Sequence, residues 1–205
     1  VQPMRFADGL REMAVMFVLQ AAAKGLGFRY EAEGELPAVV RADEKRLRQI
    51  LFNLLGNAIK FTVTGHVTLR VRHSRQMAHI AVEDTGPGLS DEERARIFEP
   101  FARGSGAAAS TTGAGLGLAM AKMLTELMGG SLAVHSTPGQ GAVFQVTLFL
   151  PSVDEAAAPA APLRTPRGYH GPRRRVLVVD NEEADRELIV QLLTPLGFAV
   201  HQAGD

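Results

Sequence analysis

The segment 43–61, DEKRLRQILFNLLGNAIKF, constrains the fold most, because it carries two stripes at the spacing of an α-helix. An apolar stripe predicts a helix that buries one face, with Asp43 as its N-cap. The apolar stripe consists of Leu47, Ile50, Leu51, Leu54, Leu55, Ala58 and Ile59. The polar stripe consists of Arg46, Gln49, Asn53, Asn57 and Lys60. At about 100° per residue, the polar side chains fall within about 80° of one another, so two carboxamides and an ammonium converge.

The two asparagines of the polar stripe need a reason to be inside a helix. Asn competes for backbone hydrogen bonds and is a mediocre helix former. A solvated helix face explains the stripe when this segment is taken alone. A ligand site explains it when the two glycine-rich segments that follow are taken with it.

The first glycine-rich segment is VEDTGPGLS at residues 82–90. It places Asp84 at the end of an expected strand and then Gly86 and Gly88, whose missing side chains let the backbone approach a flat ligand closely. A carboxylate at that position can accept a hydrogen bond from an exocyclic amine. The alternative is a plain turn, because Asp, Gly and Pro are also the residues that turns prefer.

The second glycine-rich segment is GAGLGLAM at residues 113–120. Three alternate glycines precede an apolar helical run, a setting in which free backbone N–H groups and the helix dipole hold phosphate. The pattern differs from the dinucleotide-binding motif, because its third glycine comes one residue too early and no strand precedes it.

The remaining periodicity predicts helices and mostly antiparallel strands that segregate along the chain. Helices are expected at residues 10–25 and 43–61 and from the last glycines to about residue 128. Strands are expected at residues 26–32, 65–72, 77–84, 132–136 and 142–150. The pair 65–72 and 77–84 forms a hairpin in this scheme. The expected fold class is therefore α+β, a two-layer α/β sandwich.

Composition excludes several other kinds of protein. The 205 residues include 22 basic and 22 acidic side chains, so there is no general attraction to nucleic acid or to an anionic membrane. The chain contains no cysteine, which excludes disulfides and thiolate metal sites. The apolar run 13–23 is shorter than the roughly 20 residues that span a bilayer, so we expect a core helix and no membrane contact.

A change of composition at residues 151–172 predicts a linker, because Pro, Ala and Gly replace the apolar periodicity. The strand-like run VLVVD, a helical leucine pattern and a second strand-like run then follow, which is typical of the start of a βαβ unit. Chains below about 40 residues seldom bury an independent core. We therefore expect one domain at 1–150, a linker at 151–172 and a truncated unit at 173–205.

Taken together, the asparagine-bearing helix, DxGxG, a phenylalanine pair and GxGxG form a specific pattern in this order. NLLGNAIKF, EDTGPG, FEPF and GAGLGLAM resemble the N, G1, F and G2 boxes of the catalytic ATP-binding domain of histidine kinases. This domain belongs to the GHKL superfamily, with gyrase and the mismatch-repair and chaperone ATPases. The resemblance covers roughly residues 6–150 and implies a Bergerat-type ATP-binding fold, a mixed and mostly antiparallel sheet with helices on one face. It implies ATP and Mg²⁺ as cofactors, and Ala114 departs from the threonine that the family often carries.

The resemblance also implies roles for residues of the first two boxes. Asn57 ligates the Mg²⁺ that bridges the ATP phosphates, a task suited to a hard oxygen donor, and Asn53 supports it. Lys60 places a positive charge on a phosphate, and Phe61 or a neighbour packs on adenine. Asp84 accepts from the adenine amino group, which selects adenine over guanine. Without the resemblance, Lys60 is a surface lysine and Phe61 a core phenylalanine.

Further contacts follow from the same resemblance. Gly86 and Gly88 line the base. The phosphates lie along Gly113, Gly115, Leu116 and Gly117. The small residues of segment 103–113 are typical of a mobile lid, from which Arg103 either reaches the phosphates or stays solvated. Phe98 and Phe101 anchor the base of the lid and offer a surface to the helices that carry the acceptor histidine.

Three functions stay open at this point. Hydrolytic relatives carry a glutamate one turn before the metal-binding asparagine, where this chain has Asn53. An amide is no general base, so phosphoryl transfer to an external acceptor is favoured over hydrolysis. ATP hydrolysis and nucleotide-dependent docking without turnover are the alternatives. The acceptor is expected upstream of Val1, because the family's acceptor context surrounds none of the six histidines, His66, His73, His79, His135, His170 and His201.

The segment after the linker resembles the start of a receiver domain, which implies a hybrid sensor kinase of a bacterial phosphorelay. Asp180 matches the first Mg²⁺-binding acid, Asn181 replaces the second, and the phosphorylated aspartate lies beyond Asp205. The implied partners are the kinase's own dimerisation helices, in a homodimeric parent, and a receiver domain or response regulator. We expect a cytoplasmic fragment, and an upstream anchor of the parent in the inner membrane stays open.

Overall fold

The computed structural model describes residues 1–101, 115–153, 171, 174–179, 186–187, 189–190, 193–194 and 197–204. The chain separates into two compact units, Val1–Pro159 and Ala160–Asp205. Each unit is described by itself below.

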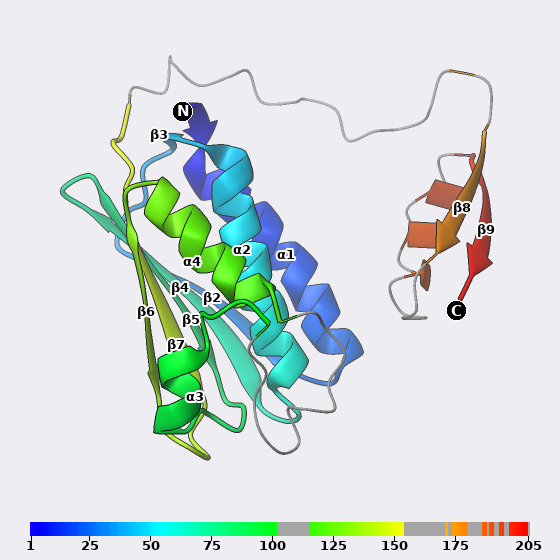
Figure 1. The fold of residues 1–205 in the computed structure, drawn as a ribbon. Helices are drawn as coiled ribbons and strands as arrows, with labels where there is room; N and C mark the ends of the chain where they lie inside the picture. The colour runs from blue at the N-terminus through cyan, green and yellow to red at the C-terminus, as the bar shows by residue number, and fades with distance from the viewer. Residues whose placement is uncertain are drawn as a thin grey trace. The chain divides into compact units, whose positions relative to one another are not determined.

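A five-stranded mixed sheet forms one layer of the first unit (Figure 1). Its strand order is β2 (Gly27–Glu33), β4 (His66–Ser74), β5 (Met77–Asp84), β7 (Ala142–Phe149) and β6 (Ser131–Ser136). The pairs β4–β5, β5–β7 and β6–β7 are antiparallel, whereas β2 runs parallel to β4. The parallel pair is possible because a long connection, which includes a helix, separates the two strands.

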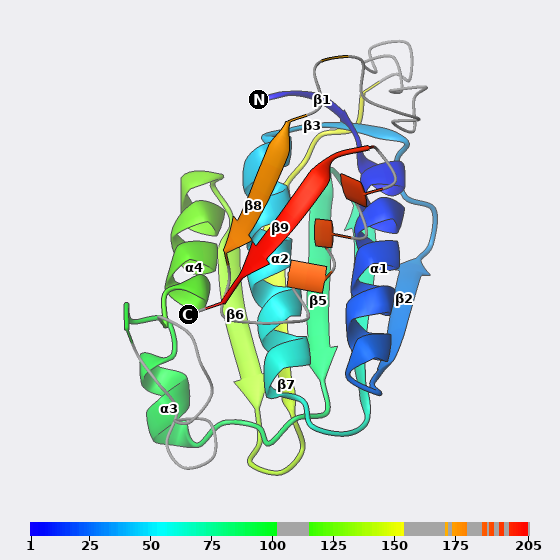
Figure 2. The ribbon, with the colours of Figure 1, turned by 90° about the vertical axis from the view of Figure 1, so that its right-hand side faces the viewer.

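Three helices form the second layer and cover one face of this sheet (Figures 1 and 2). They are α1 (Phe6–Ala23), α2 (Glu44–Phe61) and α4 (Gly117–Leu127). The expected two-layer sandwich is confirmed. Helix α1 begins four residues before the expected start at residue 10, because Phe6 and Ala7 are already buried in its first turn.

The sequence-based prediction missed three short elements. Strands β1 (Gln2–Arg5) and β3 (Val39–Ala42) pair in a small antiparallel sheet, and neither four-residue strand has a clear polar alternation. Helix α3 (Asp91–Arg96) buries no residue, so it has no apolar period to detect. A capping box between Ser90 and Glu93 starts it instead.

Helix α2 occupies the centre of the core. The seven apolar residues expected to form its buried face are all buried, with at most 5% of any of them exposed. They pack onto inward-facing residues of the sheet such as Leu69, Val71 and Ile80. Burial of a Leu or Ile side chain contributes roughly 1.5–3 kcal/mol, so this face fixes the rotation of α2 firmly. The opposite, polar stripe is fixed with it.

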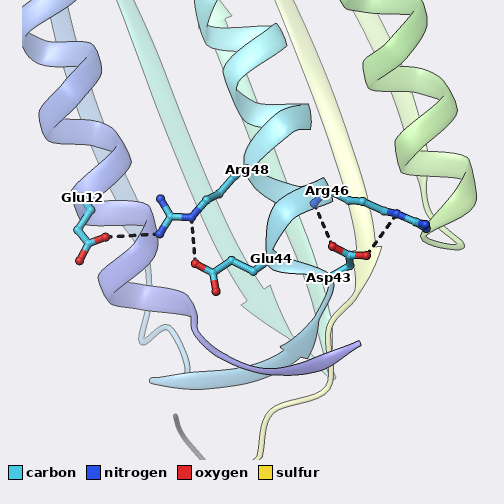
Figure 3. Close-up of polar contacts among 5 residues, drawn as sticks. All are labelled: Glu12, Asp43, Glu44, Arg46 and Arg48. Atoms are coloured by element: carbon cyan, nitrogen blue, oxygen red, sulfur yellow. Dashed lines mark hydrogen bonds and ion pairs between the residues drawn. The ribbon is translucent and has the colours of Figure 1, made fainter. Parts of the chain in front are cut away.

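Polar contacts at the N-terminus of α2 set its first turn (Figure 3). The Asp43 carboxylate accepts from the Arg46 backbone N–H at 3.1 Å, which confirms the expected N-cap, and pairs with Arg46 Nε at 3.3 Å. Arg48 bridges Glu44 on α2, at 3.0 Å, and Glu12 on α1, at 3.4 Å. Such partly exposed pairs contribute little individually, about 0–1 kcal/mol each, so the cap is the more important contact.

The second unit contains a parallel strand pair, β8 (Arg175–Val179) and β9 (Ala199–Ala203). Strand β8 overlaps the expected run VLVVD at 176–180, and β9 overlaps the second expected strand at 198–201. A parallel pair needs a crossover connection, which agrees with the expected βαβ order.

We predict that Asp43→Ala lowers the free energy of unfolding by about 1 kcal/mol, because the Arg46 N–H loses its acceptor at the N-terminus of α2. Urea denaturation followed by circular dichroism measures the loss. Asp43→Ser is the matched control, since serine keeps the cap but removes the charge. Equal destabilisation by both substitutions would show that the ion pair, and not the cap, is the stabilising contact.

Candidate functional site

The polar stripe of α2 faces the start of α4. A Cβ atom added to Gly117 would lie 3.4 Å from Asn57 Nδ2 and 3.9 Å from Asn53 Oδ1. The backbone at the beginning of α4 therefore approaches both carboxamides closely. Two segments that the sequence analysis assigned to the same site, separated by 60 residues between Asn57 and Gly117, meet in the fold.

Asn53 carries an unpaired donor at this meeting point. Its Oδ1 accepts from Gln49 Nε2 at 3.2 Å. Its Nδ2 is buried and has no hydrogen-bond partner within the described part of the chain. A buried donor without an acceptor costs about 1–3 kcal/mol, so native proteins seldom keep one without a reason. An anionic ligand between α2 and α4 would supply the missing acceptor.

Asp84 lies at the end of β5, between its ladder partners Val67 on β4 and Ala142 on β7. Its Oδ1 accepts from the Gly86 N–H at 2.9 Å. Burial raises the pKa of the Asp84 carboxyl above its ordinary value of 3.8, and the backbone N–H groups of Gly86 and Ala142 oppose that rise. The two backbone hydrogen bonds thus replace only part of the hydration that the carboxylate loses in the fold.

The loop after Asp84 leaves little room for side chains at its two glycines. A Cβ on Gly86 would lie 2.8 Å from Asp84 Oδ1 and 3.4 Å from the Phe61 carbonyl oxygen. Gly88 has a φ of +68°, which favours glycine. The loop therefore lies against the C-terminal end of α2. The structure brings Asp84, Gly86 and the backbone of Phe61 together.

The C-terminal end of α2 carries the two other expected residues. The Lys60 ammonium lies 5.5 Å from the centroid of the Phe61 ring. Lys24, at the end of α1, donates to the carbonyls of Ile59 and Lys60 at 3.1 and 3.0 Å. A cation at this end of a helix complements the helix dipole. The local sequence gives no signal for this role of Lys24, since only the fold brings α1 to those carbonyls.

Gly115 and Leu116 connect the F-box region to α4. Gly115 has a φ of +67°, and its carbonyl accepts from the Phe101 N–H at 3.1 Å. The two phenylalanines of the F-box region differ in their surroundings. The Phe101 side chain is 70% exposed, whereas the Phe98 ring packs edge-on against Phe144 of β7, with ring centroids 6.5 Å apart. Leu116 is 40% exposed at the N-cap of α4 and contributes its carbonyl to the first helical bond, from Met120.

Some expected site residues lie outside the described part of the chain. They are Arg103 and Gly113 of the expected lid region, Ala114 beside them, and Asp180 and Asn181 of the second unit.

Two residues that the sequence analysis did not assign to the site hold Asp84 and its loop. The Thr85 hydroxyl accepts from the His66 N–H at 3.0 Å, beside Gly65, whose φ is +108°. Gly141, with a φ of +86°, lies so close to Asp84 that an added Cβ would be 1.9 Å from the Asp84 carbonyl oxygen. Only the fold shows that the turn between β6 and β7, which contains Gly141, packs against the end of β5.

The described residues contain no group of three or more His, Asp or Glu side chains placed to hold a metal ion. None of their helices is long and apolar enough to cross a membrane.

The fold and the site define a class of protein. Its members are α/β sandwiches with a ligand site formed by a helix that carries asparagines, an acid at the end of a strand and a glycine-rich helix start. A family model described as histidine kinase-, DNA gyrase B-, and HSP90-like ATPase matches residues 42–152. The chain belongs to this ATPase family. The resemblance and the fold class expected from the sequence are confirmed.

Curated relatives are sensor proteins of which the chain spans a minor part. The aerobic respiration control sensor protein ArcB of Escherichia coli K12 is 38% identical over an alignment of 210 positions, which covers 98% of this chain and 26% of ArcB. The virulence sensor protein BvgS of Bordetella bronchiseptica is 41% identical over 170 residues, 78% of this chain and 14% of BvgS.

Solved structures of histidine kinases share the fold. Full-length ShkA, crystallised with AMPPNP, superposes with a TM-score of 0.63 at 35% identity, over 97% of this chain and 39% of ShkA. The nucleotide-free catalytic domain of histidine kinase ThkA gives a TM-score of 0.62 at 26% identity, over 77% of this chain and 98% of that domain.

The raised pKa of Asp84 predicts how Asp84→Asn changes stability with pH. Above the folded-state pKa the fold holds a poorly solvated charge, whereas below the ordinary value of 3.8 the carboxyl is neutral in both states. We therefore predict that Asp84→Asn unfolds at higher urea concentration than the wild type at neutral pH. This advantage disappears as the pH falls below 3.8.

Denaturation curves across this pH range measure the effect. Glu35→Gln is the control, because Glu35 lies at an exposed position after β2 and its charge stays hydrated in the fold. A marked loss of stability in Asp84→Asn at neutral pH would contradict this account of the carboxyl.

Proposed function

We propose that this chain is the ATP-binding catalytic domain of a hybrid sensor histidine kinase. In this proposal it binds Mg-ATP and transfers the γ-phosphate to a histidine on a separate helical domain. The observation that carries the proposal is the buried Asn53 Nδ2, which has no hydrogen-bond partner among the described residues and lies beside Asn57 and Gly117. The C-terminal end of the same helix contacts the loop after Asp84. Membership of the ATPase family and the names of its sensor-kinase relatives support the same function.

Adenine is assigned to the end of the site that Asp84 forms. The carboxyl is half-buried, burial raises its pKa, and a hydrogen-bond donor from the base would compensate for the water that burial removes. Adenine offers its amino group to such an acceptor, whereas guanine presents a carbonyl oxygen at the same position. Gly86 and Gly88 let the loop lie against the base, and Phe61 supplies an aromatic ring at the same end of α2.

The phosphates are assigned to the place where the start of α4 meets the polar stripe of α2. Asn53 Nδ2 donates to a phosphate oxygen there, Lys60 supplies a positive charge, and the backbone at Gly115, Leu116 and Gly117 lies alongside. Gly113 and Arg103 belong to the same proposal, although both lie outside the described residues.

Asn57 is assigned to the metal. A carboxamide oxygen is a hard donor of the kind Mg²⁺ takes, and Mg²⁺ commonly binds through few protein ligands together with phosphate oxygens and waters. The absence of an acidic cluster among the described residues fits a metal that arrives with the nucleotide. Bound there, Mg²⁺ would neutralise charge on the phosphates.

Asn53 also favours transfer over hydrolysis. A neutral carboxamide cannot take a proton from an attacking water, so the site lacks a general base at this position. The four histidines of the first unit are not proposed as the phosphoryl acceptor. His66, His73, His79 and His135 belong to sheet strands, and His73 is engaged through Nε2 by the Leu150 carbonyl at 2.8 Å. We place the acceptor on the dimerisation helices of a homodimeric parent protein.

The second unit is proposed to be the start of a receiver domain. Its parallel β8–β9 pair and the sensor-kinase relatives support this assignment. The proposed division is 1–150 for the catalytic domain, 151–172 for a linker and 173–205 for the receiver part, with Asp180 as a Mg²⁺ ligand. A receiver domain or response regulator is then the phosphoryl partner, and the fragment works in the cytoplasm.

Phosphotransfer in trans tests the proposed reaction. The chain is incubated with labelled ATP, Mg²⁺ and the parent's separately produced helical domain. Acid-labile label on the histidine of that domain is the expected result, and the chain alone stays unlabelled. Steady phosphate release without labelled histidine would support the hydrolytic alternative instead. Absence of both would support a docking module without turnover.

Nucleotide binding tests the site itself. We predict that Asp84→Asn and Asn57→Ala each abolish the fluorescence change of a bound ATP analogue, because they remove the adenine acceptor and the metal ligand, while the circular dichroism spectrum stays that of the wild type. Gln145→Ala, at an exposed position of β7, is the control and binds normally. Unchanged titration curves for the two site variants would refute the assignment.

A further inference from the structure

The Ser136 hydroxyl joins the loop after Asp84 to the turn between β6 and β7. Ser136 Oγ accepts from the Leu89 N–H at 2.9 Å and donates to the Gly141 carbonyl at 2.7 Å. Both contacts are to backbone groups, so the hydroxyl uses its proton and one lone pair. Leu89 belongs to the loop and Gly141 to the turn. One side chain therefore connects two segments that are far apart in the sequence.

Other contacts also hold the loop and the turn together, and their backbones pack directly against each other. The Gly139 N–H donates to the Pro87 carbonyl at 2.7 Å. A Cβ atom on Gly88 would lie 2.1 Å from the Thr137 carbonyl oxygen, so the loop backbone rests directly on the turn. The turn lies at the same end of the sheet as α3, which follows the loop (Figures 1 and 2). The loop thus has a fixed depth relative to β7.

The turn continues into the residues that support Asp84. Gly141 packs on the Asp84 carbonyl, and the N–H of the next residue, Ala142, stabilises the Asp84 carboxylate. Ser136 therefore contacts both sides of the acid, the loop that follows it and the turn that backs it. The hydroxyl itself is not placed to be a nucleotide contact in the proposal above.

We propose that Ser136 is a positioning residue for base recognition, whose hydroxyl holds the loop from Gly86 to Leu89 and the Gly141 turn in register around Asp84. This inference rests on the proposed adenine role of Asp84. Loss of the hydroxyl leaves the Leu89 N–H and the Gly141 carbonyl without their shared partner. The loop and the acid then lose their alignment.

The effect of Ser136 is confined to the base end of the site. Asn53 and Asn57 lie on α2, whose rotation is set by its seven buried apolar residues and not by the β6–β7 turn. A disturbed Ser136 clamp leaves that phosphate end in place. The loss of the Ser136 hydroxyl therefore weakens the binding of a nucleotide that hydrogen-bonds to Asp84 more than the binding of one that does not.

Two nucleotides and three variants test this proposal in the 205-residue chain. Affinities are measured by calorimetry for ATP and for purine riboside triphosphate, which lacks the 6-amino group. Ser136→Ala removes the hydroxyl, and Ser136→Thr keeps it. Ser131→Ala is the matched control, because Ser131 lies at the exposed start of the same strand.

We predict that Ser136→Ala weakens ATP binding by about fivefold, the size of one lost hydrogen bond, and lowers the ratio of ATP affinity to analogue affinity. Ser136→Thr restores both values, and Ser131→Ala leaves both unchanged. Unchanged ATP affinity in Ser136→Ala overturns the proposal. Equal weakening of both nucleotides overturns it as well, because the role would then be general, and so does a Ser136→Thr variant that behaves like Ser136→Ala.

The wild-type affinities show whether a negative result concerns the proposed function or only the role of Ser136. If the wild-type chain binds neither nucleotide, or binds both with equal affinity, the adenine role of Asp84 is wrong. If the wild type prefers ATP and Ser136→Ala keeps that preference in full, the role of Ser136 alone is wrong.

Discussion

The site depends on the packing of the apolar face of α2 against the sheet. That packing sets the rotation of the helix, and the rotation directs Asn53 and Asn57 toward the first residue of α4. A rotation by one residue, about 100°, would remove both amides from the site. The packing of the hydrophobic core therefore fixes the positions of the polar side chains that form the site.

Two groups at this site are poorly compensated by the protein itself. Asn53 Nδ2 is buried without an acceptor in the described part of the chain, and burial raises the pKa of Asp84. The first group is a donor on α2, and the second is an acceptor at the end of β5, whose following loop contacts the C-terminal end of α2. A ligand with an anionic end and an amino-bearing end satisfies both, as a nucleotide does. Uncompensated groups of this kind are typical of functional sites, because the ligand completes them.

The sequence predicted the long, periodic elements well, since their burial leaves a pattern. The apolar face of α2, its Asp43 cap and the β4–β5 hairpin follow from residue spacing alone. Strands β1 and β3 and helix α3 leave no such pattern, because they are short or bury nothing. Likewise the glycine and asparagine motifs indicated which residues belong to a site, but the contacts of Lys24 and Ser136 are products of tertiary structure and have no local signal.

The central claim, that one nucleotide completes both ends of the site, is tested most directly by NMR of the chain titrated with Mg-AMPPNP. The account predicts that the side-chain amide signal of Asn53 and the backbone amide signals of Gly86 and Gly117 shift together with one affinity. The side-chain signal of Gln145, at an exposed position of β7, should stay in place. Binding that leaves the Asn53 signal unmoved, or that shifts Gly86 and Gly117 with different affinities, would contradict the claim.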